Sequence, residues 1–478
     1  MVSVQGFVTK LAAASVLLVS MAAGAGVTVL HGFDYDDGEY PEGRLLIGHD
    51  GRIYGTTYAG GSSHVGTVFA VGTDKVHTIL HSFSGPDGLS LDAGLVQWAD
   101  GTLFGSTPQG SVTIGNVVTS FGGSVFKLGP DGSGFSTLRT FSGSVPDGSQ
   151  PGMLVDGGDG YLYGGMRVGG SSSAGTLFKI APDGALATIY TFTPSVGFVP
   201  DRQLTLGSDG KLYGALRNGP APNADGVLFR IDRSGGAYTQ LHAFNGNDGA
   251  APSGALVEFG GAFYGVTGGG GATGNGTVFR LAADGSLSTL HAFNGSDGAG
   301  PLGPLALGPD GNLYGLTYGG GLDWGGTIFR ISPQGAFTLL HRLVYADGTH
   351  PFAGPVMGAD GMLFGATTQG GGGSLATGSV FQFDALAPQP AALSLSKACY
   401  NEFNTCFRPI NTGVGQRYDV FWSSENLSTC VASGAWNGTK PPAGSLSVTP
   451  TRPGIFTYRL VCSGPRGIKA ASVTVTVG

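Results

Sequence analysis

Five histidines occupy one recurring position of the chain, and their side chains could supply metal ligands or acid–base groups. A metal site needs ligands that converge on one point, whereas a position that recurs along a repeat disperses them. We therefore predict that each histidine hydrogen-bonds a neighbouring threonine or aspartate and stiffens its repeat, and we predict no metal site and no cofactor. The histidines are His31, His81, His242, His291 and His341, with Arg139 and Tyr190 at the same position in two further copies.

Aspartates also recur, each directly before a glycine. Asp-Gly pairs are typical of turns, because aspartate bonds nearby backbone groups and glycine accepts positive φ. We interpret them as turn residues rather than as catalytic acids. They are Asp87, Asp147, Asp248, Asp297 and Asp347.

A second recurring position, three residues after a repeated glycine, carries side chains suited to binding. Arginine forks and tyrosine rings could hold an anionic or polyhydroxyl ligand, and Trp324, preceded by Asp323, adds a large ring to a loop. The alternative is that these are ordinary surface residues whose stems cover the fold. The predicted ligand-binding residues are Tyr58, Arg167, Arg217, Tyr318, Asp323 and Trp324, with His64, Tyr345 and His350 as further candidates.

Catalytic motifs are largely missing from the sequence. No GxSxG, HExxH, phosphate-loop lysine or CxxC occurs. The GxGxxG at Gly269, Gly271 and Gly274 precedes a predicted strand rather than a helix, so it fails as a dinucleotide site. Catalytic residues therefore remain unassigned.

The elements that position these residues belong to a tandem repeat. Three landmarks recur seven times over residues 27 to 384, namely an aliphatic-aromatic-glycine triplet, a GTVF-like strand and an LHxF-like strand. A period near fifty with several short strands per unit is typical of propeller blades. In the sixth unit we expect strands at Leu305 to Gly308, Asn312 to Tyr318, Gly326 to Ser332 and Ala336 to Leu343.

The ends of the repeat region are out of phase. The chain enters with a lone LHGF strand at Leu30 to Phe33 and leaves with a GSVF strand that has no LHxF strand after it. If the entering strand, within residues 27 to 33, completes the last unit, no sheet edge stays free. We predict an all-β fold with a closed, seven-bladed β-propeller over residues 26 to 384.

Connections alternate between the two ends of an antiparallel meander. The longer loops after the LHxF and LYGxT strands should share one face, where binding residues are usually found. An insertion at Gln109 to Gly123 on this face could be a flap over the central opening or a decorative hairpin.

The N-terminal residues Met1 to Ala25 combine Lys10, an apolar run and a small-x-small cleavage pattern, which predicts a secretory signal peptide; the alternative is an uncleaved anchor. No other segment is apolar enough to cross a bilayer, and we expect a secreted, periplasmic or cell-surface protein. The net charge of −7, without a Lys/Arg cluster, argues against nucleic-acid binding.

The repeat resembles that of the GloVer family of choice-of-anchor tandem-repeat proteins, over GTVFRLAADGSLSTLHAFNGSDGAGPLGPLALGPDGNLYGLTYGGG at Gly276 to Gly321. The resemblance implies a secreted or surface-held bacterial protein whose repeats form a propeller. It implies no catalytic residues.

After a linker at residues 385 to 392, the composition changes, and residues 393 to 478 read as a small β-sandwich. The run from Phe421 to Pro465 resembles a bacterial immunoglobulin-like module, which implies a spacer or adhesion role. All four cysteines lie here and allow three pairings. We favour Cys430 with Cys462 across the sandwich and Cys399 with Cys406 closing a local loop.

These features favour an exported, non-catalytic protein that binds glycans or partner proteins through one loop face. One alternative is a polysaccharide lyase or glycoside hydrolase with its site at the central opening, although hydrolysis calls for a carboxylate pair. The other is a structural cell-surface protein that needs no site.

Overall fold

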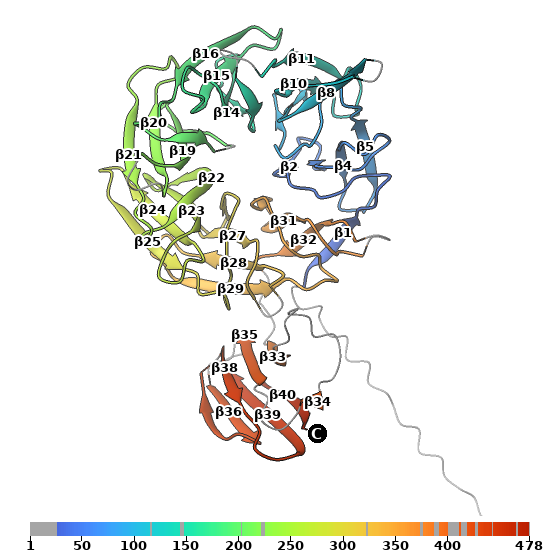
Figure 1. Cartoon of the computed structure of the whole chain (residues 1–478), viewed down its shortest axis with the longest axis vertical. Helices are drawn as coiled ribbons and strands as arrows, with labels where there is room; N and C mark the ends of the chain where they lie inside the picture. Colours follow the sequence, from blue (N-terminus) through green and yellow to red (C-terminus); the bar gives the residue numbers. More distant parts are fainter. Residues whose placement is uncertain are drawn as a thin grey trace, which may run out of the picture.

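The computed structural model describes residues 26–477 except 115–116, 144–147, 202, 221–224, 322–323, 373–375, 387–391, 400–410, 413–417, 426–428, 442 and 465–466. The expected signal peptide and most of the expected linker lie outside the described residues. Every regular element in the described part is a β-strand, so the predicted all-β class is confirmed (Figure 1).

Between Thr28 and Asp384, the described strands form seven sheets on one plan, arranged as a ring around a central opening (Figure 1). In each sheet a short inner strand, an LYG-type strand, a GTVF-type strand and an LHxF-type strand pair side by side and antiparallel. We name each sheet after its LYG-type strand.

The β3 sheet holds β2 (Leu46–Ile47), β3 (Ile53–Thr57), β4 (Thr67–Val71) and β5 (His77–Ser82), and the β7 sheet holds β6 (Val96–Gln97), β7 (Leu103–Thr107), β10 (Ser124–Leu128) and β11 (Ser136–Thr140). The β14 sheet holds β13 (Val155–Asp156), β14 (Leu162–Val168), β15 (Thr176–Ile180) and β16 (Leu186–Thr191), and β12 (Ser149–Pro151) also pairs with β14. The β19 sheet holds β18 (Thr205–Leu206), β19 (Leu212–Asn218), β20 (Val227–Ile231) and β21 (Thr239–Ala243), and β17 (Phe198–Pro200) also pairs with β19.

The β23 sheet holds β22 (Ala250–Phe259), β23 (Ala262–Gly269), β24 (Thr277–Ala282) and β25 (Leu287–Ala292). The β27 sheet holds β26 (Ala306–Leu307), β27 (Leu313–Thr317), β28 (Thr327–Ile331) and β29 (Phe337–Arg342). The β31 sheet holds β30 (Val356–Met357), β31 (Met362–Thr367), β32 (Ser379–Asp384) and β1 (Thr28–Gly32). In the sixth unit the four strands lie inside the expected ranges, each shorter by one residue at both ends.

The two ends of the repeat region meet in the β31 sheet. β1 runs antiparallel to β32, with Thr28 opposite Gln382 and Gly32 opposite Ser379. In Figure 1 the blue N-terminal strand lies beside these orange strands. The first described strand therefore supplies the outer strand of the sheet that ends the repeat, and that sheet edge is paired rather than free.

The landmark glycine of each LYG-type strand lies under a phenylalanine ring. Gly55 is opposite Phe69 of the GTVF-type strand, and a Cβ on Gly55 would come within 2.4 Å of the ring. The same pairing recurs at Gly315 and Phe329, where the distance would be 2.2 Å. The buried rings fill cores between neighbouring sheets, as where Phe69 packs in one cluster with Val380. The repeated glycine is therefore a packing requirement.

Short turns join the inner and LYG-type strands at one end of each sheet, which we call the turn face; six of the seven turns are Asp-Gly, and the β22–β23 turn is Gly260-Gly261. There the Tyr54 hydroxyl donates to Asp50 at 2.8 Å, and Tyr314 bonds Asp310 in the same way at 2.8 Å. Burial, then the hydrogen bond to Asp310, raises the pKa of Tyr314 to about 12, so this donor stays protonated.

The opposite end, which we call the loop face, gathers the connections that follow the LHxF-type and LYG-type strands. These two connections pair with each other through isolated bridges, such as Glu39 with Ala59 and Ala299 with Gly319. The insertion at Gln109 to Gly123 forms a hairpin of β8 (Gly110–Ile114) and β9 (Val117–Phe121). The predicted grouping of the longer connections on one face agrees with this pairing.

The C-terminal residues form two further sheets, red in Figure 1. Val420 packs into one core with Tyr458 and Trp436 of the other sheet, and the Trp436 indole donates to the Arg459 carbonyl at 3.0 Å. One sheet holds β33 (Ala392–Cys399), β35 (Tyr418–Glu425) and β38 (Ala443–Val448); the other holds β34 (Asn411–Thr412), β40 (Gly467–Val477), β39 (Gly454–Gly464), β36 (Thr429–Gly434) and β37 (Gly438–Lys440).

Candidate functional site

The five repeated histidines bond aspartates of the loops that follow them. In each case histidine Nε2 lies 2.7–3.1 Å from an aspartate Oδ2 six residues later. The other carboxylate oxygen usually accepts a backbone N–H, as Asp87 does from the Ser84 amide at 2.9 Å. Of the two predicted partners, aspartate is the one found. The pairs are His31–Asp37, His81–Asp87, His242–Asp248, His291–Asp297 and His341–Asp347.

The same aspartates connect neighbouring sheets through their backbone carbonyls. The Ser124 hydroxyl of β10 donates to the Asp87 carbonyl at 2.8 Å, and Thr327 of β28 donates to Asp297 at 3.1 Å. Burial by itself would raise the pKa of Asp87, but hydrogen bonds from His81 and Ser84 outweigh it and hold that pKa below its ordinary value. These residues thus fasten the loop-face connections in place.

His31, Asp37 and His77 form the cluster whose atoms come closest to a metal-binding arrangement, with ligand atoms within 4.8 Å of one another. However, the two imidazole rings are stacked, 3.8 Å apart and 2° from parallel. Lone pairs in parallel ring planes do not converge on one ion. In other sheets Phe135 and Phe337 stack on the repeated histidines in the same way. The cluster is therefore a stacking position, and it does not fit a metal.

The predicted binding residues lie on four different sheets. Tyr58 follows β3 and Tyr318 follows β27, and both rings are exposed at the loop face. Arg167 and Arg217 lie near the ends of the neighbouring strands β14 and β19, where Arg217 is exposed and Arg167 is half-buried. Trp324 is 61% exposed, more than either Tyr58 or Tyr318. Asp323 lies outside the described residues.

Every exposed aromatic side chain of the described residues lies in a loop-face connection. Phe198 is one of the seven. The other six come from the connections between the β27 sheet and the β3 sheet, and we call them the aromatic arc. Its members are Tyr35, Tyr40, Tyr58, Tyr318, Trp324 and Tyr345.

Hydrogen bonds between loops hold the arc together. The Tyr58 amide donates to the Tyr40 carbonyl at 3.0 Å, and the Tyr40 amide donates to Thr377 at 2.9 Å. At the other end, the Tyr318 ring meets the His350 ring edge to face, with centroids 5.0 Å apart. Burial lowers the pKa of His350, so its imidazole is neutral near pH 7. The arc therefore stands on fixed loops.

Trp324 has a left-handed backbone, with φ at 57°. Trp324 lies two residues before the glycine that begins the GTVF-type strand, and the residues at this position in other units are left-handed too. They are His64 with φ at 57°, Ser173 with φ at 52°, Ala376 with φ at 57° and Gly274 with φ at 78°. A bulky residue in this conformation costs on the order of 1 kcal/mol. Since the indole is exposed, core packing does not explain its presence.

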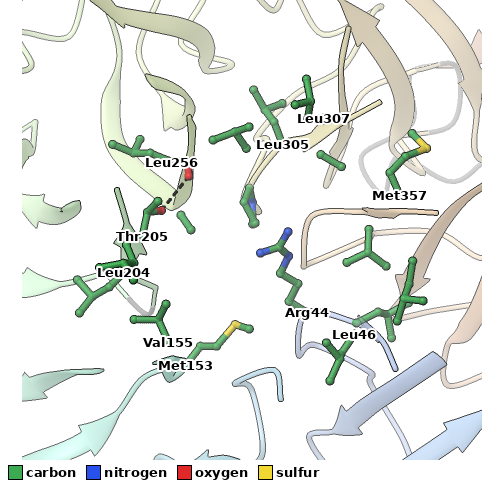
Figure 2. A pocket seen from close by; sticks show the side chains of 18 of the residues that line it. Arg44, Leu46, Met153, Val155, Leu204, Thr205, Leu256, Leu305, Leu307 and Met357 are labelled. Carbon is green, nitrogen blue, oxygen red and sulfur yellow. Dashed lines mark hydrogen bonds between the residues drawn. The ribbon is translucent and has the colours of Figure 1, made fainter. Parts of the chain in front are cut away.

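A cavity of about 590 Å³ lies at the centre of the ring, lined by residues of all seven inner segments (Figure 2). Its side chains are aliphatic except for Arg44 and Thr205, and the Thr205 hydroxyl donates to the Leu256 carbonyl at 2.8 Å. Arg44 points into the opening in Figure 2. Among the described residues, no carboxylate, histidine or tyrosine lines the cavity, so it offers no acid–base pair for hydrolysis.

The sequence matches the Gloeobacter/Verrucomicrobia repeat in three overlapping segments, residues 13–118, 113–267 and 202–397. Together these segments include the whole ring. The chain belongs to the Gloeobacter/Verrucomicrobia repeat family. This confirms the resemblance found in the sequence. No curated protein matches the chain.

Solved structures resemble this Gloeobacter/Verrucomicrobia repeat protein in fold. The extracellular domain of a hybrid two-component system, BT3049 of B. thetaiotaomicron, has a TM-score of 0.50 at 9% identity, with 94% of this chain and 57% of that chain covered. The extracellular domain of the one-component system BT4673 of B. thetaiotaomicron has a TM-score of 0.49 at 10% identity, with 95% of this chain and 58% of that chain covered. PorZ, a surface component of the type-IX secretion system of Porphyromonas gingivalis, has a TM-score of 0.44 at 10% identity, with 94% of this chain and 61% of that chain covered.

The repeat protein spans about three fifths of the length of each of these chains. The first likeness is one of fold alone and shows nothing of activity. The described residues contain no helix long and apolar enough to span a membrane.

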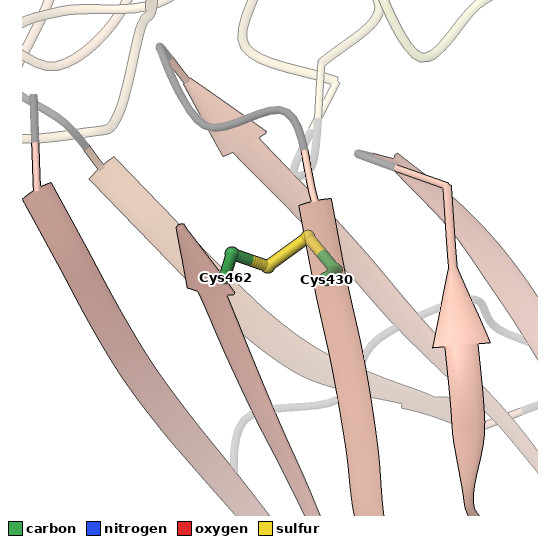
Figure 3. The surroundings of a disulfide bond; sticks show 2 residues. All are labelled: Cys430 and Cys462. Carbon is green, nitrogen blue, oxygen red and sulfur yellow. A yellow bond between two sulfur atoms is a disulfide. The ribbon is translucent and has the colours of Figure 1, made fainter. Parts of the chain in front are cut away.

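A disulfide joins Cys430 to Cys462, as the sequence analysis favours, but it does not cross the sandwich (Figure 3). The two cysteines are directly opposite each other on β36 and β39 of one sheet, with Cα atoms 4.0 Å apart. The expectation of a bond between sheets was wrong, because strand spacing along the chain does not specify which strands become neighbours. Of the predicted Cys399–Cys406 pair, Cys399 is the last residue of β33 and Cys406 lies outside the described residues.

Arg44 is the site residue that sequence reasoning missed. It lies two residues before the first paired residue of its inner strand, and the equivalent residues in the other sheets are uncharged. Aligning the seven units on this position would have found the single cation. The equivalents are Gly94, Met153, Gln203, Ala255, Pro304 and Gly354.

Proposed function

We propose that this protein is an exported, non-catalytic, seven-bladed β-propeller that binds polysaccharides through the aromatic arc, carried with an immunoglobulin-like spacer module. The observation that carries the proposal is that, among the residues the structure describes, the exposed aromatic rings all lie at the loop face. Tyrosine and tryptophan rings stack on the apolar faces of sugar rings while their polar atoms remain hydrated.

An extended chain suits the arc better than a compact partner does. The six rings stand at separate points along adjoining connections, with glycine-rich backbone between them, rather than in one packed patch. Such a surface offers aromatic stacking platforms, and the exposed Asp36 beside Tyr35 can accept hydrogen bonds from sugar hydroxyls. Trp324 supports a binding role, because its indole is 61% exposed although smaller residues such as Ser173 and Ala376 fill the same turn position in other units.

Seven similar sheets and the pairing of β1 with β32 support seven blades over residues 26 to 384, closed by the first strand. The two C-terminal sheets that share a core with Trp436 support the immunoglobulin-like module, residues 393 to 478. Residues Met1 to Ala25 support export as a signal peptide, and the disulfide suits an oxidising compartment.

A polysaccharide array, followed by affinity electrophoresis on each hit, tests the proposal with the mature chain. A variant combining Tyr58→Ala, Trp324→Gly and Tyr345→Ala should lose binding by at least about 10-fold. Phe198→Ala, which removes an exposed ring outside the arc, is the matched control and should bind like wild type.

Arg167→Ala with Arg217→Ala forms a separate arm, which asks whether the predicted arginines extend the binding surface. Product analysis on each hit should find no cleavage. Equal binding by wild type and the arc variant, cleavage products, or capture of a protein instead of any glycan would contradict the proposal. No binding at all would favour a purely structural surface role.

A further inference from the structure

The central cavity contains one charged side chain in an otherwise aliphatic lining. Arg44 Nε is buried and has no hydrogen-bond partner in the part of the chain that the structure describes. Arginine remains a cation at neutral pH. The residue as a whole is half-buried and no described carboxylate lines the cavity, so a bound anion would be the counter-ion of this guanidinium.

The inner strands pack closely at the position of Arg44. At the equivalent position of the neighbouring sheet stands Gly94, and a Cβ there would lie 2.5 Å from the Arg44 carbonyl oxygen and 3.1 Å from its Cβ. Gly354 meets the Pro304 carbonyl oxygen in the same way, so this spacing depends on the backbone and not on the guanidinium. The closely packed backbone holds Arg44 at the wall of the cavity.

The lining also restricts the kind of anion. Arg44 presents one planar fork of donors, which matches the two oxygens of a carboxylate. The lining offers no second cation among the described residues, so a monoanion is better matched than a phosphate dianion. The remaining surface is made of side chains such as Ile47, Val155, Leu206 and Met357, which suit a hydrocarbon body.

The position of Arg44 along its strand orients such a ligand. Leu46 and Ile47 pair with Tyr54 and Ile53 and continue toward the turn face, whereas Arg44 precedes them on the loop-face side. From residue 44 to residue 47 an extended chain covers about 10 Å. This length suits a medium-chain aliphatic tail, with its carboxylate toward the loop face.

We propose that the central cavity binds a monocarboxylate with an aliphatic body, such as a medium-chain fatty acid, through a forked ion pair with Arg44. This small-molecule site is separate from the aromatic arc and goes beyond the proposed polysaccharide binding. Either site can exist without the other.

Isothermal titration of the mature chain with decanoate tests the inference. We expect saturable binding of one decanoate per chain, weakened at least about 10-fold by Arg44→Met. Methionine is a fair replacement because Met153 occupies the equivalent position of the β14 sheet. Arg452→Met, which removes an exposed arginine of the C-terminal module, should leave decanoate binding unchanged.

Two further measurements separate ion pairing from a folding defect. Decanol, with the same tail and no carboxylate, should bind wild type and Arg44→Met equally weakly. Val155→Trp, which keeps Arg44 and fills the cavity, should also abolish decanoate binding while the circular dichroism spectrum stays unchanged. Absence of saturable decanoate binding to wild type, or equal affinity for wild type and Arg44→Met, would overturn the inference. Neither result bears on polysaccharide binding at the arc.

Discussion

Replacing His77 by phenylalanine should remove part of the acid sensitivity of the ring. Burial, and then the charge of His31, lowers the pKa of His77 to about 4, from an ordinary value of 6.5. Protons therefore bind the unfolded chain more readily than the folded one. The unfolding free energy that depends on a neutral His77 is therefore fully present above pH 6.5 and is lost as the pH falls toward 4. Phe135 occupies the equivalent stacking position on His81, so the substitution preserves the stack.

The size of the effect follows from the pKa difference. One pKa unit corresponds to about 1.4 kcal/mol, so wild type should lose about 2 kcal/mol of unfolding free energy between pH 7 and pH 5 that His77→Phe does not lose. Most aspartates stay ionised over this window. Urea unfolding followed by circular dichroism at both pH values measures the difference.

A matched control replaces the exposed His49 with glutamine, and its pH dependence should follow that of wild type. Parallel pH dependence in wild type and His77→Phe would refute the reasoning. It would mean that His77 is protonated in the folded ring, sharing the charge of Asp37 rather than stacking as a neutral ring.

Three other substitutions or treatments test the packing and the network. Gly315→Ala places a methyl group 2.2 Å from the ring of its cross-strand phenylalanine, and urea unfolding should show a loss of about 1–3 kcal/mol. Asp297→Ala removes the bond from His291 and the loop cap, and should cost about 1–3 kcal/mol and speed amide exchange in the loop that follows. Reducing the Cys430–Cys462 bond should destabilise the C-terminal module by about 3–4 kcal/mol in the loop-entropy estimate, while the calorimetric transition of the ring stays unchanged.

Each of these has a matched comparison. Gly236→Ala adds a methyl group at a site with no atom closer than 3.7 Å and should be tolerated. Asp74→Ala removes an aspartate that caps a turn without bonding a histidine, and should cost less than Asp297→Ala. Equal costs within either pair would contradict the assigned roles.

The architecture was predictable because every unit repeats the same physical requirement. Gly55 and its equivalents must lie under a phenylalanine ring, and each loop aspartate must meet its histidine, so both patterns return at a fixed spacing. The unmatched LHGF strand at Leu30 to Phe33 likewise had one place to pair. Repetition of this kind averages out the ambiguity of any single short strand.

Features present in one copy were harder to predict. Arg44 stands alone in a column of uncharged residues, and its meaning depends on the cavity that seven inner strands enclose. His77 likewise takes a position filled elsewhere by phenylalanine. The sequence located the exposed Tyr58, Tyr318 and Trp324, but their grouping in an arc depends on which loops become neighbours around the ring.

Hydrogen exchange of the mature protein, with and without its best-binding polysaccharide, tests the central claim most directly. The account predicts slower exchange in the loop-face connections at residues 34–40, 58–66, 318–321 and 344–350, and unchanged exchange in the Asp-Gly turns of the opposite face. Protection confined to those turns, or to the C-terminal module, would contradict it.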